Sequence, residues 1–394
     1  MSVRLHRLTM VAERDGVMVG RPDTGSYAMF PEEGAETLRL LGAGKPVDEI
    51  AAWYERECGT PLDFDDFFEV LDELGFLVAE DAEAPVAKPV RWQRAGRWAF
   101  SWPAWCLYVA LMVGAVVAMF RVPSLRPSYE VFFFTDHISL IPIVLTFTQI
   151  PLVLLHEWFH VLAGRRLGLP STLGIGRRLY YLVAETRLDA LLSVPRRQRY
   201  LPFLAGMLLD AILVSALTLT AGWLMGEAVP AWLPGMLLAI SFSTLLRLVW
   251  QFMFYLETDL YHVIATALRC ADLQNATRFL IRSRTRRWLR RPAPVPDAEW
   301  TDRDLVVARW YAPLLVLGYG FSLGSLAWAG IPTVWRFWST VFDRVTAPDT
   351  PASEVIDTLV FLSMAVAQLG LLIYVTVRDR RARRRTRVEQ GALA

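Results

Sequence analysis

Long apolar runs after residue 98 predict six membrane-spanning helices. Each run is about 20 residues long and almost free of charge, which is enough to cross the roughly 30 Å hydrocarbon core of a bilayer. The predicted spans are residues 99–120, 138–163, 201–225, 231–254, 311–331 and 355–377. The pattern indicates a polytopic α-helical membrane protein whose transmembrane domain covers residues 99–377.

Residues 1–82 show short alternating runs instead, which predicts a separate soluble domain. Turn signals at Asp15-Gly16 and Thr24-Gly25 separate three predicted strands, at residues 3–10, 17–20 and 26–30. Helical spacing of apolar residues then predicts three helices, at residues 31–42, 48–58 and 63–74. Three strands followed by three helices indicate a small α+β domain of winged-helix-like type.

Polar segments flank the transmembrane domain. Residues 83–98 form a predicted linker that ends in arginines before the first span, and residues 378–394 form a basic tail. Arginine-rich segments also follow the second and fourth spans, whereas few basic residues follow the first, third and fifth. By the positive-inside rule, we expect a multi-pass protein of a bacterial inner or plasma membrane, with both termini in the cytoplasm.

Composition supports the membrane interpretation and argues against a nucleic-acid partner. The 394-residue chain is 54% hydrophobic and 20% charged, with a mean hydropathy of +0.33, which is too apolar for an ordinary soluble protein. Arginine clusters can bind nucleic acid, but beside predicted spans they are typical of cytoplasmic flanks. The acidic third helix of the first domain would repel phosphate, which disfavours the alternative of a DNA-binding winged helix.

The second predicted span carries the sequence His156-Glu157-Trp158-Phe159-His160 near its cytoplasmic end. On a helix the two histidines lie one turn apart on one side, where their nitrogens can bind one zinc ion at about 2.0–2.1 Å. Glu157 is placed to take a proton from a water that the metal activates and to deliver it to a leaving amine. Such polar residues are costly in an apolar helix, which favours a catalytic zinc site over a structural or degenerate one.

A catalytic zinc site uses three protein ligands, so one more is expected. Residues 257–262 follow the fourth span on the cytoplasmic side, at the level of the two histidines. Asp259 is a candidate ligand there, and Glu257 and His262 are alternatives. An acid at a span end is also commonly a solvated cap, and spacing alone leaves these interpretations open.

Two further charges lie inside predicted spans, Asp210 on the third and Arg247 on the fourth. An isolated charge at membrane depth is expensive, so the two side chains could pair. One interpretation is that they orient substrate or an oxyanion. The other, which we favour, is a structural ion pair or charges that snorkel toward the membrane surface. Tyr261 likewise has two interpretations, as a hydrogen-bond donor to the transition state or as an interfacial tyrosine.

The transmembrane half resembles the site-2-protease family of intramembrane zinc metallopeptidases, especially its peptide zinc metalloprotease branch. The resemblance covers about residues 138–275 and rests on three segments: His156 to His160, Leu204-Ala205-Gly206-Met207-Leu208-Leu209-Asp210, and Thr258-Asp259-Leu260-Tyr261. It implies that Asp259 is the third zinc ligand and that the segment around Gly206 holds substrate. The match is not complete, because Leu260 stands where the family usually has glycine, and Met207 and Asp210 replace the proline and asparagine of its Gly-Pro-x-x-Asn pattern.

The first domain resembles the PqqD-like peptide-recognition domains of ribosomal peptide (RiPP) maturation systems. The resemblance rests on Asp23-Thr24-Gly25-Ser26-Tyr27, Glu32-Glu33-Gly34-Ala35, Leu40-Leu41-Gly42 and Leu71-Asp72-Glu73-Leu74-Gly75-Phe76-Leu77-Val78. In that family a leader peptide adds as an extra strand to the edge of the sheet, where backbone hydrogen bonds give affinity and pockets give selectivity. The resemblance therefore implies a precursor peptide as partner.

Together these features predict an intramembrane zinc endopeptidase that faces the cytoplasm. It would bind a ribosomally made precursor peptide through residues 1–82 and remove its leader or otherwise mature it. One alternative is a regulatory site-2-type protease of a membrane-bound signalling substrate. A second, non-enzymatic alternative is a peptide transporter or immunity protein with a vestigial motif. The expected partners are the peptide and the lipid bilayer, without nucleic acid.

Overall fold

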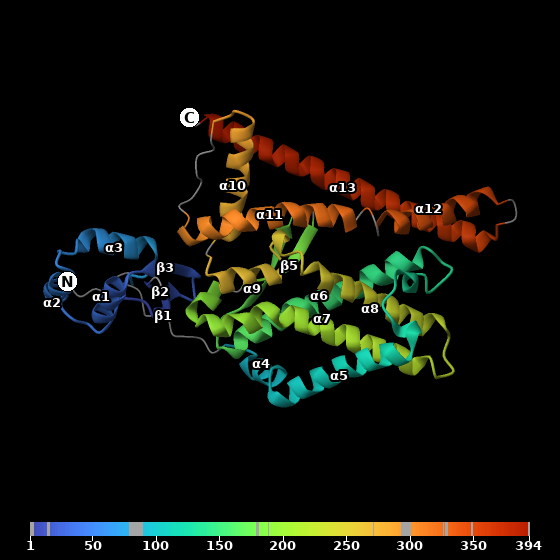
Figure 1. The fold of residues 1–394 in the computed structure, drawn as a ribbon, viewed down its shortest axis with the longest axis horizontal. Helices are drawn as coiled ribbons and strands as arrows, with labels where there is room; N and C mark the ends of the chain where they lie inside the picture. The colour runs from blue at the N-terminus through green and yellow to red at the C-terminus, as the bar shows by residue number, and fades with distance from the viewer. Residues whose placement is uncertain are drawn as a thin grey trace. The chain divides into compact units, whose positions relative to one another are not determined.

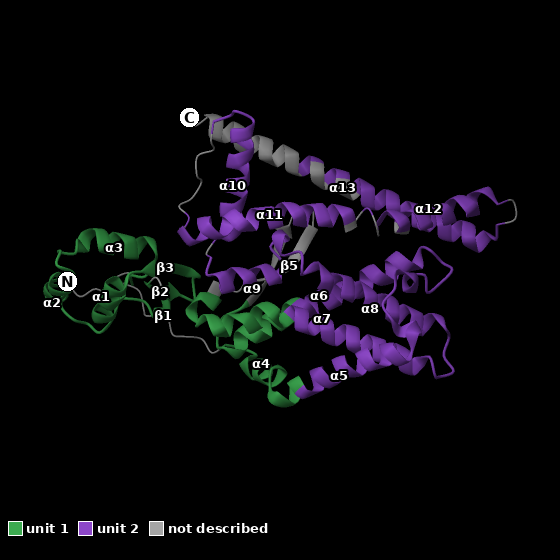
Figure 2. Ribbon diagram, viewed as in Figure 1, with its two compact units in different colours: residues 1–105, 157–174, 186–205 green, residues 106–156, 175–185, 206–394 purple. Residues whose placement is uncertain are grey.

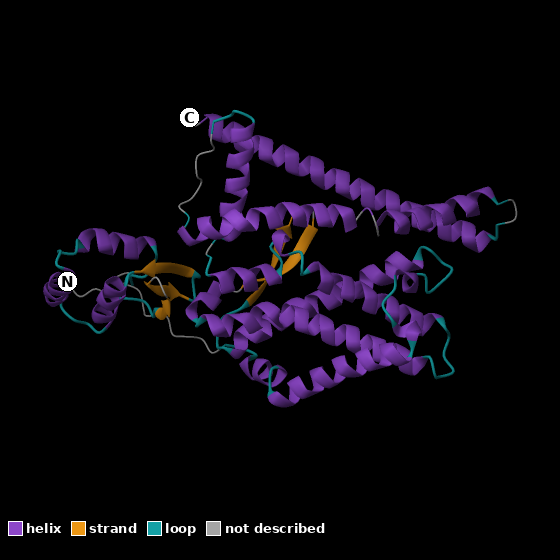
Figure 3. Cartoon of the chain, in the orientation of Figure 1, coloured by secondary structure: helices purple, strands orange, loops and turns teal. Residues whose placement is uncertain are grey.

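A computed structural model describes the chain except residues 1–3, 14–15, 79–89, 179–180, 188, 271, 293–299, 301, 326, 328–329, 348–349 and 393–394. The described part is mostly helical, with two small antiparallel sheets (Figure 1 and Figure 3). The chain folds as two compact units, coloured separately in Figure 2. Unit 1 comprises residues 1–105, 157–174 and 186–205, and unit 2 comprises residues 106–156, 175–185 and 206–394.

The first part of unit 1 contains three strands followed by three helices. In chain order they are β1 (Thr9–Glu13), β2 (Gly16–Arg21), β3 (Ser26–Phe30), α1 (Glu32–Gly42), α2 (Val47–Cys58) and α3 (Phe64–Glu73). The central strand β2 pairs antiparallel with β1 and with β3. Helix α3 begins where the Asp63 carboxylate accepts hydrogen bonds from the backbone N–H groups of Asp65 at 3.0 Å and Asp66 at 3.2 Å, which is a regular N-cap.

Strand β1 begins at Thr9, later than the predicted residues 3–10. The residues before it pair elsewhere. Leu5 forms a β-bridge with Leu77, and the His6 N–H donates to the Phe76 carbonyl at 2.9 Å. The apolar N-terminal run thus has two partners, β2 and the segment after α3, and its hydrophobic pattern does not distinguish them.

Within the described residues, six helices are long and apolar enough to cross a membrane. They are α5 (Trp102–Arg121), α6 (Leu140–Arg166), α7 (Arg196–Leu224), α8 (Trp232–Trp250), α11 (Asp302–Ser325) and α13 (Ala352–Ala392). The predicted set of long apolar helices is therefore confirmed. The shorter elements are α4 (Gln93–Ala99), η1 (Pro123–Leu125), η2 (Tyr129–Phe132), β4 (Thr172–Arg178), β5 (Tyr181–Arg187), η3 (Asp189–Ser193), η4 (Phe254–Leu256), α9 (Asp259–Leu268), α10 (Leu273–Trp288) and α12 (Ile331–Thr346).

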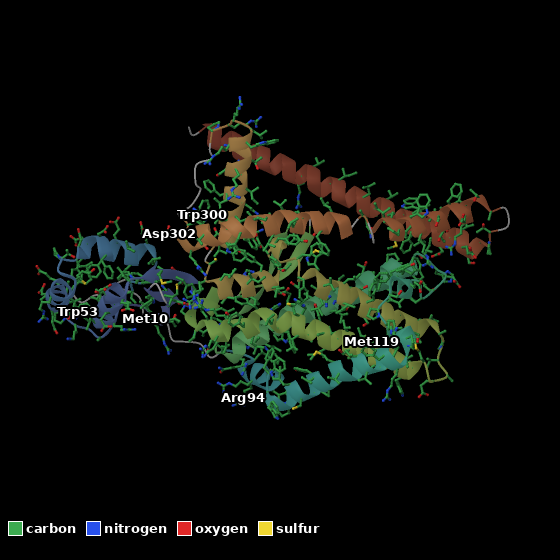
Figure 4. The ribbon with its side chains drawn as sticks, viewed as in Figure 1. Met10, Trp53, Arg94, Met119, Trp300 and Asp302 are labelled. Atoms are coloured by element: carbon green, nitrogen blue, oxygen red, sulfur yellow. The ribbon has the colours of Figure 1, made fainter. Side chains whose placement is uncertain are left out.

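Helix α11 begins at Asp302, well before its predicted apolar span at residue 311. Its start is tied to the start of α10: the Trp300 indole N–H donates to the Asp272 carboxylate at 3.4 Å, and the Asp304 carboxylate accepts from the Asp272 N–H at 3.3 Å. Figure 4 labels Trp300 and Asp302 in this region. Acidic residues in a first turn suit the positive end of a helix, so a polar cap extends α11 beyond the part that hydropathy detects.

The start of α6 is anchored by α12 and α13. The buried Asp357 carboxylate of α13 accepts hydrogen bonds from the N–H groups of Ile138 at 2.8 Å and Ser139 at 3.0 Å. Arg344 of α12 donates to the same carboxylate at 2.7 Å. These bonds satisfy amide groups that a helix N-terminus leaves without an internal partner, and they hold the helix that carries the two motif histidines.

Two glycines of α11 provide a matched test of packing beside η4. A Cβ on Gly318 would lie closer than 3.0 Å to the Tyr255 ring, whereas a Cβ on Gly320 would meet nothing within 4 Å. We expect Gly318→Ala to destabilise the protein by about 1–3 kcal/mol through overpacking. Gly320→Ala should leave stability unchanged or raise it by up to about 1 kcal/mol, because it removes a helix-interior glycine. Thermal unfolding of both variants in detergent checks this, and equal midpoints would contradict the packing described here.

Candidate metal centre

His156 and His160 lie one turn apart on α6, and each is 3% exposed. His156 Nδ1 lies 3.0 Å from a carboxylate oxygen of Asp210, and His160 Nδ1 lies 2.7 Å from the Pro202 carbonyl oxygen. A carboxylate and a carbonyl can only accept, so each Nδ1 carries a hydrogen and donates it. In the neutral rings Nε2 then holds the lone pair, which is the form that binds a metal ion.

One face of α7 supplies both of these acceptors. Pro202, Gly206 and Asp210 follow one another at intervals of four residues, so they lie along one side of the helix. All three are buried. Gly206, which was expected to hold substrate, lies between the acceptors for His160 and His156. A residue without a side chain at this position permits close approach of two helices.

Asp259 is the first residue of α9, and one of its carboxylate oxygens lies 3.2 Å from His156 Nε2. Gln251 at the end of α8 fixes the segment: its side-chain oxygen accepts from the Asp259 N–H at 3.1 Å, and its backbone carbonyl accepts from the Thr258 hydroxyl at 2.7 Å. The Asp259 side chain is 24% exposed. These two hydrogen bonds to Gln251 therefore hold the backbone of residues 258 and 259 so that the Asp259 carboxylate points toward the histidines.

The two alternative ligands, Glu257 and His262, are not in the group of possible metal ligands that contains Asp259. Glu257 has a left-handed backbone with φ of +59°, and its carboxylate pairs with Arg278 at 3.0 Å. His262 is exposed, and its ring packs on Tyr261 with the ring centroids 5.4 Å apart. Among the residues that the structure describes, the group with metal-ligand geometry consists of His156, His160 and Asp259.

The three side chains fit a divalent metal ion. Their ligand atoms all lie within 4.8 Å of one another. Ligand atoms about 2.0–2.1 Å from a tetrahedral zinc ion are about 3.3 Å apart, close to the 3.2 Å between His156 Nε2 and Asp259. With Nδ1 donating to Asp210, the neutral His156 ring directs an Nε2 lone pair at an Asp259 carboxylate oxygen, and a cation at this place would satisfy both acceptors.

The charges of Asp210 and Arg247 are paired. Arg247 Nη2 lies 2.5 Å from one Asp210 oxygen, and Arg247 Nε lies 3.1 Å from the other. The Asp210 side chain is 0% exposed. The ion pair that the sequence left as one possibility is formed, and Asp210 also accepts from His156, a contact that residue spacing did not reveal.

Tyr261 is buried on α9. Its hydroxyl accepts a hydrogen bond from the Gln274 N–H at 3.1 Å, so it ties α9 to α10. Burial raises the pKa of Tyr261 to about 12, so the phenol stays protonated near neutral pH.

Glu157 follows His156 on α6 and is half-buried.

Three partners of the site are not predicted from the sequence: Pro202, Gln251 and Gln149, whose side-chain oxygen accepts from Arg247 Nη1 at 2.8 Å. Gln149 is a polar residue in an apolar helix, a signal of the kind that identified Asp210. Pro202 acts through its backbone carbonyl, a group that every residue has, so the residue type does not indicate this role.

No protein-family model, curated protein or solved structure matches this chain.

Metal content tests the triad. His160→Ala and Asp259→Ala should each weaken zinc binding by more than the about 10–100-fold that loss of an outer partner causes, because each removes a ligand atom. His137→Ala is the control, since His137 is exposed before the start of α6. The measurement is zinc per protein by mass spectrometry after dialysis against a weak chelator. If both ligand variants keep the wild-type zinc content, the triad does not bind the metal.

Proposed function

We propose that this protein is a multi-pass membrane zinc endopeptidase that cuts peptides at the membrane. The observation that carries the proposal is the triad of His156, His160 and Asp259, with both imidazoles buried and fixed through Nδ1. Two histidines and a carboxylate are a donor set that catalytic zinc sites use, and such sites have three protein ligands. The position of Glu157 directly after the first ligand favours hydrolysis over other metal chemistry.

Six long apolar helices support placement in a membrane, and α6 is one of them. The arginine distribution supports a cytoplasmic location for both termini in a bacterial plasma membrane. His156 and His160 then lie in the cytoplasmic part of α6, where water can reach the site. Asp259 is the most exposed member of the triad, which is consistent with access from that side.

A zinc ion bound by the triad would act as a Lewis acid and lower the pKa of a water molecule to about 7. Glu157 takes the proton of the attacking water as the oxygen bonds to the peptide carbonyl carbon. The same carboxyl group then delivers this proton to the leaving nitrogen as the C–N bond breaks. His156 and His160 keep their Nδ1 hydrogens throughout, because the Asp210 carboxylate and the Pro202 carbonyl accept hydrogen bonds but are much weaker bases than a deprotonated ring nitrogen.

The N-terminal domain is proposed to capture the substrate. In the order β1-β2-β3, strand β3 lies at an edge of its sheet, and an edge strand can pair with an extended peptide. The domain is tied to the start of α7: Glu13 pairs with Arg196, and also with Arg199 at 2.9 Å. The Tyr27 hydroxyl lies 2.9 Å from that of Ser193 in η3. A peptide held by this domain would reach the membrane domain at raised local concentration, which supports a precursor peptide as substrate.

A cleavage assay with a zinc-retaining variant tests the proposal. Purified protein in detergent is incubated with synthetic precursor peptides that include their leader segments, and new termini are mapped by mass spectrometry. Glu157→Gln should lower the cleavage rate by about 100- to 10,000-fold, the usual contribution of a general acid–base group, while zinc content stays at the wild-type level. Glu227→Gln, an exposed glutamate after α7, should cleave like wild type.

Other results would change the proposal. Zinc-loaded protein that cuts only a membrane-anchored signalling protein, and no soluble precursor, would favour a regulatory intramembrane protease. Protein that holds no zinc and cuts nothing would favour a peptide-binding membrane protein without enzymatic activity. Equal cleavage by wild type and Glu157→Gln would remove Glu157 from the mechanism.

A further inference from the structure

Cationic or N–H donors engage both carboxylate oxygens of Asp210. His156 Nδ1 and Arg247 Nε lie 3.0 Å and 3.1 Å from one oxygen, and Arg247 Nη2 lies 2.5 Å from the other. The side chain is 0% exposed. A carboxylate with this set of partners and no exposure is not available to bind substrate.

The contacts continue beyond Asp210 and return to α6. Arg247 Nη1 donates to the Gln149 side-chain oxygen at 2.8 Å, and the Gln149 amide N–H group lies 3.3 Å from the Thr244 hydroxyl. Gln149 precedes His156 on α6 by seven residues, which is about two helical turns. Helices α6, α7 and α8 are thus joined by one closed series of hydrogen bonds that begins and ends on the helix bearing the histidines.

The two histidines differ in the partner of Nδ1. His160 donates to the neutral Pro202 carbonyl, whereas His156 donates to a carboxylate that Arg247 holds in place. A carboxylate behind a ligating histidine fixes the ring orientation and makes the ligand more basic, and loss of such a partner typically lowers metal affinity about 10–100-fold. Because of Arg247 and Gln149, the Asp210 carboxylate has little freedom to turn away from the ring.

We propose that Asp210, held by Arg247 and Gln149, is a positioning residue for His156 that sets the affinity of the triad for its metal ion. This inference rests on the metal site of the proposed function. It assigns Asp210 and Arg247 to the support of a ligand, instead of to contact with a substrate or an oxyanion.

Cobalt binding tests the inference without an activity assay. The dialysed full-length protein is titrated with Co²⁺ in the presence of a competing chelator, which gives the affinity. The visible absorption spectrum of the bound Co²⁺ reports the ligand geometry. Asp210→Asn keeps an acceptor oxygen but loses the charge, so we expect about 10-fold weaker binding. Asp210→Leu combined with Arg247→Met removes the acceptor and its counter-charge together, so we expect about 100-fold weaker binding and a changed spectrum. Replacing both members of a buried ion pair by apolar residues avoids an unpaired charge that would unfold the protein.

Thr218→Val is the matched control. Thr218 is a buried polar residue on α7, and its hydroxyl lies 3.0 Å from that of Ser241 on α8. It therefore joins the same two helices as Asp210 and Arg247, away from His156, and its loss should leave cobalt affinity and spectrum unchanged.

The outcomes separate this inference from the proposed function. If the double variant binds Co²⁺ as tightly as wild type, with the same spectrum, Asp210 does not position His156. If Thr218→Val weakens binding as much as the double variant, the effect belongs to α7–α8 packing and the inference also fails. Wild-type protein that binds Co²⁺ but cuts no peptide overturns the endopeptidase proposal alone, whereas wild-type protein that binds no Co²⁺ overturns the metal site on which both depend.

Discussion

The constraint on which the site depends is the need of each histidine on α6 for a partner at Nδ1. An apolar helix offers no solvent to satisfy that nitrogen, so an unpartnered imidazole there is costly. Helix α7 meets the need twice on one face, with the Pro202 carbonyl for His160 and the Asp210 carboxylate for His156. These two bonds fix the alignment of α7 against α6 and leave Nε2 of each ring as the atom for a metal ion. Arg247 of α8 joins the arrangement because the buried Asp210 carboxylate needs a counter-charge.

The third ligand reaches the histidines by a different physical route. Asp259 is not part of a long apolar helix; it begins the short helix α9 after the turn η4. The Gln251 bonds hold its backbone, and the α9 helix that it begins packs in an apolar cluster that includes Tyr255, Tyr261, Leu273 and Tyr311. Packing among α9, α10 and α11 thus acts on the metal centre through the placement of a single carboxylate.

The sequence predicts much of this arrangement, and the omissions have identifiable causes. Long apolar runs and helical periodicity are local signals, so the six long helices and α1 to α3 are recovered with shifted ends. The spacing of His156 and His160 is also local and predicts a shared face. The pairing of Asp210 with Arg247 follows from the cost of isolated charges, but its contact with His156 depends on how α6 and α7 align, which no single segment encodes. The contact of the Pro202 carbonyl with His160, and the pairing of the residues before Thr9 with the segment after α3, also depend on tertiary packing that no single segment encodes.

Zinc K-edge X-ray absorption on the purified, zinc-loaded protein tests whether His156, His160 and Asp259 bind the metal, because the spectrum reports the ligands of the metal itself. We expect two histidine imidazoles and at least one oxygen at about 2.0–2.1 Å from the zinc, with no sulfur at about 2.3 Å. This ligand set should be lost in the His160→Ala variant. A spectrum with sulfur ligands, or one without imidazole scattering, would show that the metal lies elsewhere and that His156, His160 and Asp259 do not form the metal centre.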